Sequence, residues 1–178
     1  MADRAMRDWI DPEGVPVTIL ARGCVDGPPK DRAFAIEVAR DLWRRRKSYD
    51  VVYFLMQGFH LAIGLPVARF LGKAILMKVG GSGVIPLMTR STAGRLELRW
   101  LREWANRIMI LNDGMKEEAL QEGFPPEQIY WMPNPVDTDK FSPCTPAERL
   151  ERRARFRIPS TAPLALYCGR LAPEKALP

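Results

Sequence analysis

Short apolar runs alternate with longer amphipathic segments along most of the chain. Each run is apolar throughout and bounded by polar residues or Gly, a pattern typical of strands buried on both faces of a sheet. The predicted strands are residues 15–20, 51–55, 74–79, 108–111 and 129–132. Fully buried strands of this kind belong to parallel sheets.

Helices are predicted between these strands. In residues 32–47, Phe34, Val38 and Leu42 fall on one helical stripe. Further helices are expected over residues 59–71, 91–104 and 114–122. Because strand and helix alternate, the sequence predicts the α/β class, a doubly wound, Rossmann-like parallel sheet with helices on both faces.

The pattern changes after residue 143. Thr145-Pro146-Ala147-Glu148 combines a capping box with Pro at the first helical position, which predicts a helix to about residue 156. A polar link then leads to a new strand over residues 164–168. We therefore expect an N-terminal lobe over residues 1–143, and a linker helix with the start of a second lobe over residues 144–178.

The loop after that last strand carries two cations. Gly169 lets a ligand approach the backbone, while Arg170 and Lys175 can neutralise phosphate charge, which suits a nucleotide diphosphate. Two cations on a surface loop are more often only solvated.

Two motifs in order make the diphosphate interpretation more specific. Residues 133–137 read P-N-P-V-D, with Asn134 and Asp137, and residues 169–175 read G-R-L-A-P-E-K. This combination resembles the family 4 glycosyltransferases of GT-B fold, in which such a turn marks the passage from acceptor lobe to donor lobe.

The resemblance implies a sugar transfer with retention of configuration. Arg170 and Lys175 would hold the donor diphosphate, with Gly169 giving it room. The co-substrate would be a UDP- or GDP-linked sugar, with no metal or other cofactor, and the acceptor would be a sugar or a lipid-linked molecule.

The chain also departs from the family pattern. Residues 14–20 resemble the family's second strand, so the chain would begin near the end of the preceding helix, without the first strand. The family's Gly after Lys175 is Ala176 here, and its paired-glutamate motif has no match. We expect a fragment, incomplete at both ends and inactive alone.

Candidate acceptor-binding residues follow the predicted strands, where ligands bind in such sheets. Gly80, Gly81 and Ser82 could present N–H groups to a phosphate or sugar oxygen, or form a plain loop. Asn112 follows the next strand. His60 could serve in proton transfer, or be a structural residue at a helix start. The family's usual histidine position holds Gly80-Gly81 here.

Charge and composition restrict the partners and the compartment. The 178 residues carry a net charge of +6 and three cysteines without metal or disulfide spacing, and no signal peptide or membrane span is evident. A cytoplasmic protein is expected.

Arg95, Arg99 and Arg102, beside two tryptophans, could place a helix peripherally on the anionic inner face of the membrane, or only flank a stripe that faces the core.

Two other functions compete with a glycosyltransferase. A sugar-nucleotide epimerase of the same two-lobed fold would need no acceptor. A nonenzymatic basic module for nucleic acid or membrane would leave the 133–137 turn and the 169–175 loop unexplained. We therefore expect no nucleic-acid partner.

Overall fold

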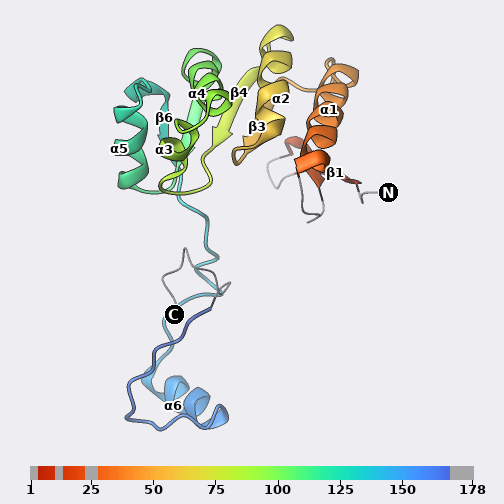
Figure 1. The fold of residues 1–178 in the computed structure, drawn as a ribbon. Helices are drawn as coiled ribbons and strands as arrows, with labels where there is room; N and C mark the ends of the chain where they lie inside the picture. The colour runs from red at the N-terminus through yellow and green to blue at the C-terminus, as the bar shows by residue number, and fades with distance from the viewer. Residues whose placement is uncertain (1–3, 11–13, 23–27, 169–178) are drawn as a thin grey trace. The chain divides into compact units, whose positions relative to one another are not determined.

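A four-stranded parallel sheet forms the centre of the N-terminal part of the chain. The computed structural model describes residues 4–10, 14–22 and 28–168 (Figure 1). The strands are β3 (Val51–Leu55), β4 (Ala74–Lys78), β5 (Arg107–Ile110) and β6 (Ile129–Trp131), and they lie in the order β3-β4-β5-β6. Each pair is parallel. The predicted Rossmann-like α/β class is confirmed.

Helices precede and connect these strands, and the four longest of them lie close to the predicted positions. They are α1 (Pro28–Arg44), α2 (Phe59–Phe70), α3 (Val84–Met88), α4 (Thr92–Trp104), α5 (Asp113–Gln121) and the 3-10 turn η1 (Pro126–Gln128). Polar side chains fix two of the starts. Ser91 Oγ accepts a hydrogen bond from Gly94 N at 3.0 Å, and Asn112 Oδ1 accepts one from Met115 N at 2.9 Å.

The helices cover one face of the sheet, which corrects the prediction of helices on both faces. Figure 1 shows α5, α4, α2 and α1 side by side along the sheet. Along β3, Val52 and Phe54 are buried, whereas Val51, Tyr53 and Leu55 are 41–55% exposed. The strands follow one another in chain order, and right-handed crossovers in one direction place every connecting helix on the same face. A doubly wound sheet requires a reversal of strand order, which these four strands do not contain.

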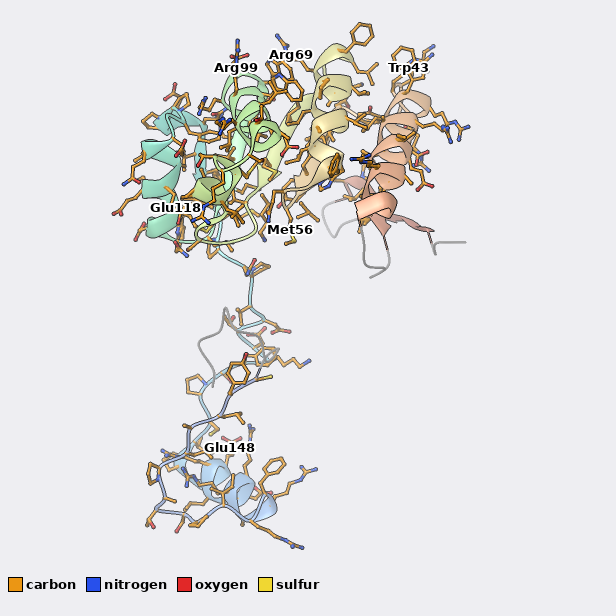
Figure 2. The ribbon with its side chains drawn as sticks, viewed as in Figure 1. Trp43, Met56, Arg69, Arg99, Glu118 and Glu148 are labelled. Carbon is orange, nitrogen blue, oxygen red and sulfur yellow. The ribbon has the colours of Figure 1, made fainter. Side chains whose placement is uncertain are left out.

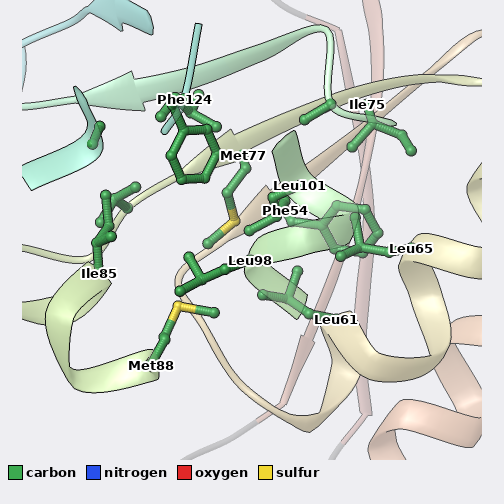
Figure 3. Close-up of a cluster of buried hydrophobic side chains, with 14 of the residues drawn as sticks. Phe54, Leu61, Leu65, Ile75, Met77, Ile85, Met88, Leu98, Leu101 and Phe124 are labelled. Atoms are coloured by element: carbon green, nitrogen blue, oxygen red, sulfur yellow. The ribbon is translucent and has the colours of Figure 1, made fainter. Parts of the chain in front are cut away.

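The core lies between this sheet and its helices (Figure 3). Side chains from β3, β4 and β5 meet side chains from α1 to α5 in one cluster. Its fully buried large members are Leu61, Leu65, Ile75, Met77, Ile85, Leu98, Ile108, Ile110 and Met115. Fully burying one such side chain contributes roughly 1.5–3 kcal/mol to stability. Packing against the helices therefore stabilises the sheet.

The N-terminal segments form a separate two-stranded sheet, which corrects two predictions. β1 (Arg4–Ile10) pairs antiparallel with β2 (Pro16–Arg22). Residues 4–10 are thus a strand and not a helix end, and β2 does not join the parallel sheet. Only residues 11–15 separate β1 from β2, which suits a hairpin and is too short for a parallel crossover.

Contacts divide the chain after Asn134 into two compact units. The second unit contains α6 (Pro146–Arg155), which begins with the predicted capping box between Thr145 and Glu148. The buried guanidinium of Arg153 donates to the carbonyl oxygens of Pro159 and Ala162. The division predicted at residue 143 stays a prediction.

The strand predicted over residues 164–168 is not formed in the structure. Leu164, Leu166 and Tyr167 are exposed. A strand is stabilised by hydrogen bonds to a neighbouring strand, and no described strand lies in this unit. The apolar run alone therefore does not determine the structure here.

Candidate functional site

The segments that follow the parallel strands meet at one edge of the sheet, here called the carboxyl edge. It comprises residues 56–60, 79–83, 111–113 and 132–134. Backbone hydrogen bonds join their starting points: Met56 N donates to Lys78 O at 3.0 Å, Val79 N to Met109 O at 3.1 Å and Met132 N to Ile110 O at 2.9 Å. Ligands of open α/β sheets bind at this edge.

Helix α5 holds the Gly80–Gly83 loop at two points. Asn112 Nδ2 donates to Ser82 Oγ at 3.3 Å while Asn112 Oδ1 caps α5. Glu118 Oε1 accepts a hydrogen bond from Gly83 N at 2.7 Å. The structure thus brings together Ser82 and Asn112, two of the predicted acceptor-binding residues. Their role in binding stays a prediction.

The same loop lies against the end of β3. A Cβ on Gly80 would lie 3.0 Å from Gln57 Oε1, a buried atom without a hydrogen-bond partner among the described residues. Met56 has a φ of 67°, in the left-handed region that non-Gly residues rarely adopt. Strained residues cluster at functional sites. Figure 2 labels Met56 and Glu118, which both lie along the lower margin of the helical lobe in that view.

His60 lies at the same edge, but its ring packs towards the helical layer. The ring centroid is 6.0 Å from that of Phe34 on α1 and 6.2 Å from that of Phe54 on β3. The side chain is half-buried. These contacts fit the structural alternative weighed for this histidine, while its role in proton transfer stays a prediction.

A lysine that sequence reasoning overlooked joins β4 to Asn134, the last residue of the first unit. Lys78 Nζ donates to Asn134 Oδ1 at 2.8 Å. Its position near the end of the strand predicted over residues 74–79 is the one sequence signal that could have drawn attention to Lys78. Asp137 lies in the second unit, where its Oδ1 accepts from Lys140 N at 2.9 Å and shapes the turn.

The predicted donor-binding residues Gly169, Arg170 and Lys175 lie outside the described residues, and their roles stay predictions. In the described ranges, no group of His, Cys, Asp and Glu is arranged to hold a metal ion. No helix among the described residues is long and apolar enough to cross a membrane.

The arginines of α4 are engaged with the lobe itself. Arg95 donates to Thr89 O at 2.9 Å, Arg102 donates to Glu122 O at 2.6 Å, and Arg99 pairs with Glu103 at 2.8 Å. Leu98 and Leu101 are buried in the core. These contacts favour the core-facing interpretation of this helix over a membrane-binding one.

Glu97 is the one carboxylate of α4 that faces the core. It is 8% exposed and makes no hydrogen bond to a described residue. Burial raises the pKa of Glu97 from 4.5 to about 7. It lies on the buried stripe of α4 with Gly94, Leu98 and Leu101, so its effect concerns stability.

The comparisons with known proteins concern the fold. No protein-family model matches the chain, and no curated protein matches it. The fold of this chain is similar to that of HepE (Alr3699) from Anabaena, which was crystallised with UDP. The TM-score is 0.54 and the sequence identity is 15%. The match covers 67% of this chain and 32% of HepE, so the chain corresponds to about a third of that protein. Crystals of HepE with UDP-glucose match with a TM-score of 0.49 and 14% identity. About two thirds of this chain therefore shares a Rossmann-like fold with part of HepE.

Proposed function

We propose that the chain is part of a GT-B glycosyltransferase, in which the carboxyl edge binds the acceptor. The enzyme moves a sugar from a nucleotide-sugar donor, UDP-linked in the first instance, to this acceptor with retention of configuration. The observation that carries the proposal is the pairing of Ser82 with Asn112 at the carboxyl edge of a Rossmann-like sheet. Ligands of such sheets bind at this edge.

Two further facts support a nucleotide-sugar donor. The sequence carries the ordered motifs at residues 133–137 and 169–175 that resemble family 4. HepE, whose fold is similar, has been crystallised with UDP. In this proposal Arg170 and Lys175 neutralise the charge that builds on the leaving diphosphate, and Gly169 lets it approach the backbone.

A transfer assay on the product of the complete reading frame tests the proposal. UDP-glucose and GDP-mannose are offered separately with a panel of sugar and lipid-linked acceptors, and NMR reads the anomeric configuration of the product. Transfer with retention supports the proposal. Conversion of the nucleotide sugar without any acceptor would instead indicate the epimerase.

Variants distinguish the two parts of the site. Arg170→Ala and Lys175→Ala should each weaken donor binding by roughly 1.5 to 3 kcal/mol, because each removes a charge-assisted hydrogen bond. Ser82→Ala and Asn112→Ala should raise KM for the acceptor and leave donor binding unchanged. If all four variants behave like the unmodified protein, neither part of the site is assigned correctly.

A further inference from the structure

The last residue of β4, Lys78, is a cation without a counter-charge among the described residues. Lys78 Nζ has one described partner, the neutral amide oxygen of Asn134. No described carboxylate lies within ion-pair distance of Lys78. The side chain is half-buried, so its charge is only partly solvated.

The neighbours of Lys78 across the sheet do not neutralise it. Leu55 on β3 and Met109 on β5 are directly in register with Lys78. Tyr130 on β6 is in turn in register with Met109. In a parallel sheet, residues in register share a face. Lys78 therefore lies in an apolar row on the open face, at the carboxyl edge.

Two residues further along, the chain offers unpaired donors. The backbone N–H groups of Gly80, Gly81 and Ser82 donate to no described acceptor, whereas Gly83 N donates to Glu118. Gly80 and Ser82 are exposed, and Cβ atoms at Gly81 would meet nothing within 4 Å. Successive free N–H groups beside a lysine suit the oxygen atoms of a phosphate.

We propose that the acceptor bound at the carboxyl edge carries a phosphate-type anionic group, which Lys78 and the N–H groups of Gly80, Gly81 and Ser82 bind. This inference rests on the proposed function, because it names the chemical class of the acceptor. The anion supplies the counter-charge that no described residue gives to Lys78. A free sugar phosphate and a lipid-linked one share this chemistry.

NMR titration of the 178-residue chain tests the inference without requiring turnover. The probes are glucose 1-phosphate, inorganic phosphate and uncharged glucose, followed through the amide signals of residues 78–83. Glucose 1-phosphate should shift the signals of Gly80 to Ser82, and glucose at the same concentration should not. If inorganic phosphate binds as tightly as glucose 1-phosphate, the anion site is still supported. The sugar ring then contributes nothing to the affinity.

Matched variants assign the effect to Lys78. Lys78→Gln keeps a donor for Asn134 and should weaken binding of glucose 1-phosphate about tenfold, the loss expected for one charge-assisted hydrogen bond. Lys78→Arg should restore most of it. Lys47→Gln is the matched control, because it makes the same change of charge at an exposed residue in the turn before β3, away from the carboxyl edge. It should leave binding of glucose 1-phosphate unchanged.

The outcomes separate this inference from the proposed function. Equal binding by Lys78→Gln, or equal shifts with uncharged glucose, would overturn the inference even if sugar transfer is found. Phosphate binding that depends on Lys78 would stand even if the complete protein transfers no sugar. In the transfer assay, a phosphorylated acceptor should be glycosylated faster than its uncharged counterpart. Comparing a free sugar phosphate with a polyprenyl phosphate sugar embedded in vesicles distinguishes a free acceptor from a lipid-linked one.

Discussion

At the scale of single residues, Glu97 makes stability depend on pH. Its pKa in the folded protein is about 7 against an ordinary value of 4.5. Between these values the folded protein keeps a proton that the unfolded chain releases. The contribution of Glu97 to the free energy of unfolding is therefore fully present below pH 4.5 and is lost as the pH rises towards 7. The loss is on the order of 3 kcal/mol.

Replacing Glu97 by Gln should remove this dependence. Urea unfolding should show Glu97→Gln to be more stable than the unmodified chain at pH 8 and close to it at pH 5. Glu117→Gln, an exposed carboxylate on α5, is the control and should leave the pH profile unchanged. A profile of Glu97→Gln that is as steep as that of the unmodified chain would show that another group titrates.

A second residue-scale prediction concerns Gly94, where α3 approaches α4. A Cβ at this position would overlap the backbone carbonyl of Met88. Gly94→Ala should therefore lower the free energy of unfolding by about 1–3 kcal/mol, because the backbone must shift. At Gly114 in α5, a Cβ would lie 3.4 Å from Asn112 Oδ1, an ordinary contact. Gly114→Ala should thus be neutral or stabilising, and equal losses for both variants would contradict the argument.

At the scale of the elements, Gln128 closes the end of α4 from a distant part of the chain. Its buried Nε2 donates to the carbonyl oxygens of Leu101, Arg102 and Ala105. Gln128→Ala should destabilise the lobe by roughly 1–3 kcal/mol, because buried carbonyl groups lose their donor. Hydrogen exchange should show earlier opening of the last turn of α4. Protection of Ala105 N–H equal to that of the unmodified chain would show that the cap contributes nothing.

The long, periodic elements could be predicted from the sequence because local pattern determines them. β3 agrees with its predicted bounds, and α2, α4 and α5 agree within a residue or two. α3 was not predicted, because its five residues are too few to show helical periodicity and include Pro86.

Pairing between elements could not be predicted in the same way. β2 has the composition of a buried parallel strand, yet its partner is β1, a segment that the family resemblance placed near the end of a helix. Residues 164–168 have the same apolar character and form no strand. Strand formation depends on a neighbour, which a single apolar run does not specify.

The candidate site was predictable in position and only partly in composition. The rule for carboxyl ends of parallel strands identified Ser82 and Asn112, which the structure joins by a hydrogen bond. Glu118 and Lys78 were missed because their partners are 35 and 56 residues away in sequence. Such contacts arise only when the sheet brings distant turns together.

At the scale of the whole molecule, we expect the 178-residue chain alone to bind UDP weakly and to transfer no sugar. The match covers about a third of HepE, and the 169–175 loop is the one segment of this sequence for which we expect contacts to a nucleotide-sugar donor. Isothermal titration with UDP and UDP-glucose should give little heat. Ordering the 169–175 loop around a diphosphate would cost conformational entropy that few contacts offset. Tight binding, or turnover by this chain, would contradict the expectation.

The order of the strands in the sheet also bears on how the lobe is built during synthesis. Because the spatial order β3-β4-β5-β6 repeats the order in the chain, each strand pairs with the one translated just before it. No strand has to wait for a later segment to be inserted between two earlier ones. Each pairing in the parallel sheet thus spans a single strand-helix-strand connection, and pairing between segments that are close in sequence costs less loop-closure entropy than pairing between distant ones. The lobe can therefore lengthen one strand-and-helix unit at a time behind the ribosome, with the apolar face of each new strand covered by its own connecting helix.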